Sequence, residues 1–300
     1  VGALQTDPSP VNNSVTSIAS AFVFPQILSQ PQSRTLTNGG TGSFSVTANG
    51  TALRYQWKHG ATDVPGGTNA VLTIANAQPG DAGDYSVTVS NAVGAVTSVA
   101  VPLTVLVPVT ITAQPQTRTA TQGTTVNFTV TATGSVPLSY QWQFEGADLS
   151  GETQSSLTLN NVQAAQAGTY RVRITNPAGS LFSANATLTI LVPPHFLTQP
   201  QSQTNYAGAS ASFTVTADGT QPIHLQWFFN ATSLLTHQTN AVLTLTNLQG
   251  ALSGNYTAVA TNLAGASTSS VAVLTVYEVD FGDAPETLGY PTVLDFNGAR

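Results

Sequence analysis

The sequence predicts an all-β protein built from three consecutive two-sheet units. Three observations carry this prediction: a recurring motif, apolar residues that alternate with polar ones along short segments, and polar residues that are mostly Thr, Ser, Asn and Gln, which fit strands and turns better than helices. The motif begins with Gln-Trp, and the tryptophans at positions 57, 142 and 227 are 85 residues apart. A fixed period of this length indicates an array of like structural units, each large enough to form its own core.

Each unit is expected to open with an edge segment and then a strand. Gln-Pro-Gln and a hydroxyl residue occur at 30–33, 114–117 and 199–202. Proline lacks the N–H donor of a sheet ladder, so it belongs on an edge strand or where the chain switches sheets. The next runs, at 44–48, 126–132 and 213–217, alternate apolar and polar residues, which indicates strands with one buried face.

The rest of each unit follows the tryptophan in a fixed order. Apolar strands are expected at 71–74, 157–159 and 242–245, and Gly-x-Tyr strands begin at 83, 168 and 254. Asn-x-x-Gly turns follow at 91–94, 176–179 and 262–265. Because asparagine and glycine tolerate positive φ, we expect these turns to use that conformation. A last alternating strand, such as 100–105, closes the unit.

As a set, these motifs resemble the I-set immunoglobulin-like domains over residues 26–277. The resemblance implies an immunoglobulin β-sandwich in each unit. It also implies that the tryptophans and tyrosines of the motif lie in the cores: Trp57, Trp142, Trp227, Tyr85, Tyr170 and Tyr256. The aspartate of the family motif is Asp81 in the first unit, but Gln166 and Leu252 replace it in the others. Its hydrogen bond should therefore be missing or substituted there.

The chain contains no cysteine. By the same resemblance, the paired cysteines of the family map onto Val46 with Val87, Val130 with Val172, and Val215 with Ala258. A disulfide closing a loop of about 40 residues would stabilise a domain by roughly 3 to 4 kcal/mol. Apolar contact is expected to fill that place instead. Such a replacement is typical of bacterial members, so the resemblance implies a bacterial protein.

These motifs divide the chain into an N-terminal segment (1–25), three units (26–107, 108–193 and 194–277) and an acidic tail (278–300). The first segment is either the last strand of a preceding domain or a strand donated to another subunit. Apolar, proline-containing junctions predict semi-rigid spacers, and hence an extended rod. The string at 280–285, Asp-Phe-Gly-Asp-Ala-Pro, resembles the start of a GEVED-type domain of bacterial secreted proteins.

Composition and charge exclude several classes of function. Only 7% of the residues are charged, against about 25% in an ordinary soluble domain. The net charge is −6 and no basic stripe exists, which excludes nucleic-acid binding by phosphate neutralisation. No apolar run reaches the length of about 18 residues that a membrane-spanning helix needs.

The sequence indicates neither an enzyme nor a cofactor. It has no Gly-x-Ser-x-Gly elbow, no cysteine nucleophile and no phosphate-binding loop. The four histidines are scattered and expected in exposed loops. Asp280, Asp283 and Glu286 are weak calcium candidates, but they lack the spacing of a calcium loop, and an acidic linker is the preferred interpretation.

Three aromatic residues just beyond the tryptophans are the candidates for ligand contact: Phe144, Phe228 and Phe229. Because Phe228 and Phe229 are adjacent, they should point to opposite faces of a strand, and one should be exposed. An exposed aromatic indicates a contact surface only when several gather on one face.

The favoured function is a non-catalytic stalk, filament element or adhesin spacer of a large exported bacterial protein at the cell surface. Its partner would be a protein, either a further copy or another surface molecule. The alternative is a carbohydrate- or protein-binding accessory region of a secreted enzyme, which would need exposed aromatics clustered on one sheet face.

Overall fold

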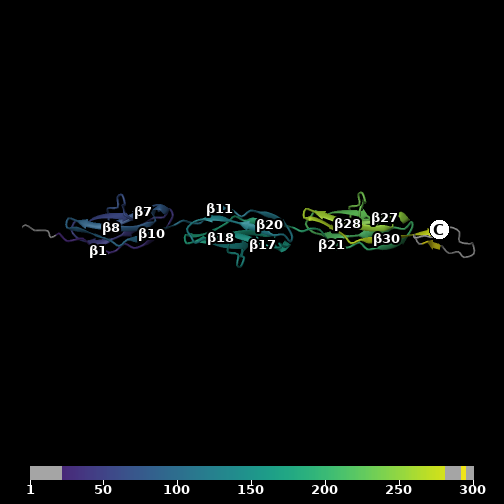
Figure 1. Cartoon of the computed structure of the whole chain (residues 1–300), viewed down its shortest axis with the longest axis horizontal. Helices are drawn as coiled ribbons and strands as arrows, with labels where there is room; N and C mark the ends of the chain where they lie inside the picture. Colours follow the sequence, from purple (N-terminus) through teal and green to yellow (C-terminus); the bar gives the residue numbers. More distant parts are fainter. Residues whose placement is uncertain (1–21, 281–291, 295–300) are drawn as a thin grey trace, which may run out of the picture. The chain divides into compact units, whose positions relative to one another are not determined.

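A computed structural model describes residues 22–280 and 292–294 and confirms the all-β prediction (Figure 1). Each sequence repeat forms one two-sheet sandwich. The predictions made for the first segment fall mainly on residues 1–21, and Asp283 and Glu286 belong to 281–291. Both stretches lie outside the described residues.

In repeat one, a larger sheet has the strand order β2-β10-β8-β5-β6, with β9 beside β8. The smaller sheet consists of two ladders, β1 with β4 and β3 with β7, and β3 and β4 are separated by one residue, Val46. The bounds are β1 (Gln26–Ser29), β2 (Arg34–Thr37), β3 (Gly42–Ser45), β4 (Thr47–Asn49), β5 (Arg54–His59), β6 (Thr62–Asp63), β7 (Val71–Ile74), a 3-10 turn η1 (Pro79–Asp81), β8 (Gly83–Asn91), β9 (Gly94–Thr97) and β10 (Val101–Leu106).

Repeats two and three have the same order. The bounds in repeat two are β11 (Thr110–Ala113), β12 (Arg118–Thr121), β13 (Val126–Thr129), β14 (Thr131–Thr133), β15 (Ser139–Phe144), β16 (Ala147–Asp148), β17 (Ser156–Leu159), η2 (Ala164–Gln166), β18 (Gly168–Asn176), β19 (Gly179–Phe182) and β20 (Ala186–Leu191). Those in repeat three are β21 (His195–Thr198), β22 (Gln203–Tyr206), β23 (Ala211–Thr214), β24 (Thr216–Asp218), β25 (His224–Phe229), β26 (Ser233–Leu234), β27 (Val242–Leu245), η3 (Gly250–Leu252), β28 (Gly254–Asn262), β29 (Gly265–Thr268) and β30 (Ala272–Asp280). A further strand, β31 (Thr292–Leu294), pairs with the end of β30.

The Gln-Pro-Gln segment is a sheet switch, as its proline predicts. In repeat one, β1 pairs antiparallel with β4 in the smaller sheet, and β2 pairs parallel with β10 in the larger one. Pro31 lies buried between them. The side chain of Gln30 fixes the switch, because its Oε1 accepts a hydrogen bond of 3.0 Å from the N–H of Val99.

Each core is centred on its tryptophan. Trp57, Trp142 and Trp227 are all 0% exposed. Each indole Nε1 donates a hydrogen bond of 2.9 Å to a backbone carbonyl in the loop before the next strand, at Asn69, Gln154 and Asn240 respectively. The buried polar end of the ring is thereby satisfied while its apolar body fills the core.

Apolar side chains occupy the positions that the resemblance assigns to paired cysteines. Val46 and Val130 are each 5% exposed, while Val87, Val172, Val215 and Ala258 are all 0% exposed. On the larger sheet, Val87 lies opposite Trp57 and Ala258 lies opposite Trp227. Sulfur-free packing around the indole therefore replaces the bridge.

The aspartate that the later repeats lack accepts a backbone hydrogen bond at η1. Asp81 Oδ2 accepts from the N–H of Gln78 at 2.8 Å, and Gln166 Oε1 accepts from the N–H of Gln163 at the same distance. The substitution by glutamine thus preserves the bond. Leu252 cannot accept the equivalent bond from Gln249, and in repeat three the N–H of the next residue, Gly250, donates to Glu278 Oε1 at 2.7 Å.

We expect Asp81→Ala to lower the free energy of unfolding of repeat one by about 1 kcal/mol, because it leaves the N–H of Gln78 without its carboxylate partner. Chemical denaturation followed by tryptophan fluorescence would measure the change. Asp84→Ala is the matched control, since Asp84 is exposed and carries the same charge. Equal effects of the two substitutions would contradict the assignment.

Candidate functional site

The three repeats share their interiors but differ on the outer face of the larger sheet. Alternation along β5, β15 and β25 directs the residue after each tryptophan outward. That residue is Lys58 in repeat one, Gln143 in repeat two and Phe228 in repeat three. Because the buried neighbours are so alike, this outer face is where the repeats acquire individual surface chemistry.

Repeat two carries a connected polar network on this face, the Arg171 cluster, formed by Gln143, Asp148, Arg171, Arg173 and Phe182. Gln143 is only 6% exposed, and its amide Nε2 donates to Asp148 Oδ1 at 2.6 Å. Its Oε1 accepts from Arg171 Nε at 2.7 Å. The guanidinium of Arg171 lies 4.3 Å from the centre of the Phe182 ring. Arg173 pairs with Asp148 across 3.5 Å.

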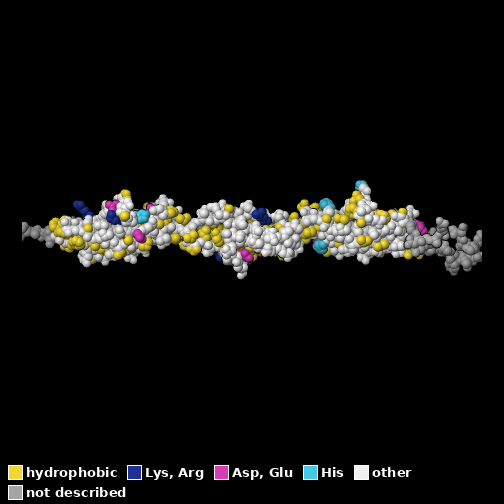
Figure 2. Space-filling model, in the orientation of Figure 1, with side chains coloured by type: hydrophobic (Ala, Val, Ile, Leu, Met, Phe, Trp, Pro, Cys, Tyr) yellow, Lys and Arg dark blue, Asp and Glu magenta, His cyan; other side chains and the backbone are white. Residues whose placement is uncertain are grey.

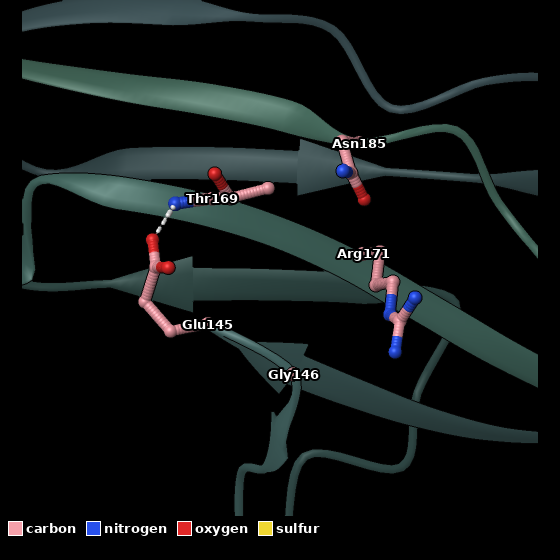
Figure 3. A pocket seen from close by; sticks show the side chains of 5 residues that line it. All are labelled: Glu145, Gly146, Thr169, Arg171 and Asn185. Carbon is pink, nitrogen blue, oxygen red and sulfur yellow. Dashed lines mark hydrogen bonds between the residues drawn. The ribbon is translucent and has the colours of Figure 1, made fainter.

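A shallow depression of about 220 Å³ adjoins the Arg171 cluster. Figure 3 shows the side chains that line it, with those of Asn185 and Arg171 on one side and that of Glu145 on the other. Glu145 Oε1 accepts a hydrogen bond of 2.6 Å from the N–H of Thr169. The depression is smaller than the roughly 300 to 1,000 Å³ of most small-molecule sites. Its lining offers a carboxylate, an amide and a guanidinium, but no nucleophile paired with a base.

The equivalent faces of the other repeats are simpler. Lys58 pairs with Asp63 at 2.7 Å, and both side chains are exposed. Phe228 lies opposite Leu234, which is 53% exposed, so that repeat three is apolar at the same place. Figure 2 shows how sparse charged side chains are over the visible surface of the described residues.

Two of the aromatic residues predicted to contact a ligand pack on the cores instead. Phe144 lies 4.9 Å from the ring of Tyr170, and Phe229 lies 5.1 Å from that of Tyr256. The prediction that Phe228 or Phe229 is exposed is wrong, because both are half-buried. Neighbouring strands explain this: Phe228 is flanked by residues of β26 and β28 on the outer face.

His59 is not the exposed loop residue that the sequence suggested. It ends β5, where its ring stacks 4.6 Å from that of Tyr85 and its Nε2 lies 3.2 Å from the carbonyl oxygen of Ala82. It therefore takes the place that Phe144 and Phe229 occupy in the other repeats. The remaining histidines, His195, His224 and His237, are exposed, but His195 and His224 begin strands β21 and β25 and so do not lie in loops.

The three motif tyrosines are buried, and each hydroxyl donates to a backbone carbonyl four residues earlier. The acceptors are Asp81 at 3.0 Å, Gln166 at 2.8 Å and Leu252 at 2.9 Å. Burial raises the pKa of Tyr85, Tyr170 and Tyr256 above the usual 10. The charge of Asp81 raises the pKa of Tyr85 further, and that of Glu145 does so for Tyr170.

We expect the sandwiches to lose stability in alkali. A tyrosine whose pKa is raised in the folded state stabilises that state fully below its unfolded pKa of about 10, and the contribution is lost as the pH rises through the folded pKa. The denaturant concentration at the midpoint of unfolding should stay constant up to about pH 10 and fall at higher pH. Tyr170→Phe should weaken that fall in repeat two, and an unchanged slope would contradict the explanation.

The positive φ predicted for the Asn-x-x-Gly turns occurs at glycine in repeats two and three, where Gly179 and Gly265 have φ of 141° and 145°. It does not occur at the asparagines, since Asn91, Asn176 and Asn262 do not have positive φ. Instead, the side-chain oxygen of Asn91 accepts from the N–H of Val93 at 3.0 Å, and its Nδ2 donates to the carbonyls of Val23 at 2.7 Å and Thr51 at 3.0 Å. Asparagine is needed for its side-chain amide, which ties the turn to chain segments distant in sequence.

Within residues 22–280 and 292–294, no group of three or more His, Asp or Glu side chains gathers that could hold a metal ion. Asp280, the first calcium candidate, is part of β30. The helical segments of that same part of the chain are all too short to cross a membrane.

Comparison with known families agrees with this architecture. Residues 25–91 and 108–176 match the family described as immunoglobulin domain, and residues 194–276 match the immunoglobulin I-set domain. The chain belongs to the immunoglobulin-domain family. Its three immunoglobulin domains are similar in fold to the I-band fragment I67–I69 from titin, with a TM-score of 0.73 and 23% identity, covering 85% of this chain and 99% of that one.

Curated relatives of these immunoglobulin domains are much longer proteins. Human Roundabout homolog 2 is 26% identical over 93% of this chain and 22% of its own length. Mouse Hemicentin-2 is 33% identical over 69% of this chain and 4% of its own length. The chain therefore spans less than a quarter of either relative.

Proposed function

We propose that this chain is a non-catalytic, adhesive and structural region of an exported cell-surface protein. The observation that carries the proposal is the contrast between shared interiors and individual outer faces. Buried tryptophan, tyrosine and apolar pairs recur in all three domains, while one outward position changes from Lys58 to Gln143 to Phe228. A scaffold that repeats its core and varies its surface is suited to presenting different contacts to partners.

The Arg171 cluster is the surface we assign to a protein partner. Hydrogen bonding by Gln143 and stacking on Phe182 hold the guanidinium of Arg171 in place. A guanidinium fixed beforehand loses little side-chain entropy when a carboxylate of the partner binds it. Arginine and aromatic residues are also the types that contribute most to protein interfaces.

The structural role that we propose for the chain is that of a spacer. Short apolar junctions with proline favour limited bending between domains, and the paucity of charge limits repulsion between neighbouring molecules. Small-angle scattering of the chain in solution should give an elongated particle. A compact particle would defeat the spacer role while leaving partner binding open. The bacterial source and the GEVED-type continuation remain proposals from the sequence, and the relatives described above come from human and mouse.

A bead assay tests the adhesive role. Beads coated with the chain are mixed with one another and, separately, applied to a glycan array. We expect the beads to aggregate and Arg171→Glu to reduce the aggregation, because it reverses the charge at the cluster. Arg118→Glu, on β12 of the same domain, is the matched control. Glycan binding without aggregation would favour the accessory-region alternative, and the absence of both would defeat the proposal.

A further inference from the structure

One valine before each domain is held by the same three hydrogen bonds, which we name the valine clamp. In repeat one, the N–H of Val23 donates to Thr51 Oγ1 at 3.0 Å. The carbonyl of Val23 accepts from the N–H of Thr51 at 3.3 Å and from Asn91 Nδ2 at 2.7 Å. Asn91 thereby joins the incoming chain to the turn between β8 and β9.

Repeats two and three contain the same clamp. Val107 donates to Ser135 Oγ at 2.8 Å and accepts from the N–H of Ser135 at 2.9 Å and from Asn176 at 2.8 Å. Val192 donates to Thr220 Oγ1 at 2.7 Å and accepts from the N–H of Thr220 at 3.0 Å and from Asn262 at 2.8 Å. Three independent occurrences make the clamp a property of the repeat.

Val107 and Val192 are junction residues. Val107 directly follows Leu106, the last residue of β10, and Val192 directly follows Leu191, the last residue of β20. The final strand of one domain is thus followed directly, with no intervening residue, by the valine of the next domain's clamp. Positions 23, 107 and 192 are 84 and 85 residues apart, which places Val23 in register with both junctions.

The surroundings of Val23 differ from those of the two junctions in exposure. Phe22 corresponds to Leu106 and Leu191, which are half-buried at the ends of their strands, but Phe22 is 58% exposed. Phe24 and Val93 are 53% and 49% exposed. The ring of Phe24 lies so close to Gly94 that a Cβ there would clash with it. Apolar side chains around the clamp therefore leave much of their surface uncovered.

We propose that Phe22, Val23, Thr51, Asn91 and Val93 form a domain junction, and that its occupant is a further immunoglobulin-like unit preceding repeat one in the chain. The last strand of that unit would be followed directly by Val23, as β10 is followed by Val107 and β20 by Val192. A strand donated to another subunit would instead reach Val23 from a separate molecule. The array of immunoglobulin-like units would then be longer by at least one unit. This inference does not depend on the adhesive role proposed above.

A chimera tests the proposal by replacing residues 1–22 with residues 108–191, so that Leu191 precedes Val23 directly. Hydrogen exchange of the Val23 amide should then be as slow as that of Val107 and Val192, and the added domain should unfold cooperatively. Asn91→Ala in this chimera should speed exchange at Val23 about tenfold, the effect of losing one hydrogen bond to a partly buried carbonyl, and leave Val107 unchanged.

A second chimera with a short Gly/Ser insert before Val23 controls for folding of the added domain. The proposal fails if the added domain folds only when the insert is present. It also fails if the Val23 amide is protected from exchange only when the insert is present, because either result would mean that the start of repeat one cannot follow another domain directly. The other decisive measurement is the oligomeric state of the original chain, determined by analytical ultracentrifugation. A dimer that dissociates on deletion of residues 1–21 would overturn the proposal in favour of strand donation.

Discussion

Trp142→Ala is expected to destabilise repeat two by about 3 to 5 kcal/mol, the usual effect of deleting a large aromatic side chain from a core. The indole is 0% exposed and lies 6.2 Å from the ring of Phe128. Its loss would leave a cavity and would also deprive the carbonyl of Gln154 of its donor. Because a domain of this size has only about 5 to 15 kcal/mol of stability, this substitution removes a large part of it.

The three tryptophans make the measurement selective, because each domain contains one. Chemical denaturation followed by fluorescence of Trp57 and Trp227 should show the other two domains unfolding as before, while circular dichroism reports the early loss of repeat two. Val136→Ala is the control, since Val136 belongs to the same repeat and is 82% exposed. A Trp142→Ala variant as stable as this control would exclude a central role for the indole.

The interior of each domain could be read from the sequence because burial imposes local patterns. Alternation along a strand reports one buried face, and the period of the Gln-Trp motif places the cores. The outcome at η2 and η3 also follows from the sequence: glutamine at 166 keeps the acceptor and leucine at 252 does not. Apart from the period, these features depend on residues within a few positions of each other.

The Arg171 cluster could not be found in this way. It joins Gln143, Asp148, Arg171 and Phe182 from four strands, and nothing in the local sequence of any strand indicates the others. The prediction for the asparagines of the Asn-x-x-Gly turns is wrong for a related reason, since asparagine favours positive φ and side-chain hydrogen bonds alike. Only the structure shows that the partner of Asn91 is Val23, 68 residues away.

The acidic tail shows how composition can conceal a structural role. Glu278 was grouped with the acids that follow it, but β30 continues through it to Asp280. Its carboxylate accepts a hydrogen bond from the N–H of Gly250, the residue next to Gln249, whose own N–H has no acceptor in Leu252. A glutamate in a run of acids gives no local signal of such a contact, because its partner lies 28 residues earlier.

The second large effect on stability is expected from introducing a disulfide at the positions where the family has paired cysteines. Val46→Cys with Val87→Cys, once oxidised, should raise the free energy of unfolding of repeat one by about 4 kcal/mol, because the bridge closes a loop between positions 41 residues apart and restricts the unfolded chain. The reduced variant should be less stable than the parent, since two buried valines become smaller side chains. Denaturation with and without reductant separates the two contributions.

Repeat two of the same molecule, with Val130 and Val172 intact, serves as the internal reference for that experiment. An oxidised variant no more stable than its reduced form would mean that the sheets around Trp57 are spaced for valine and that forming the bridge strains them. A gain near the chain-entropy value would mean that the sandwich still accommodates a bridge, and that packing of Val46 and Val87 around the indole is one of two ways to stabilise the same core.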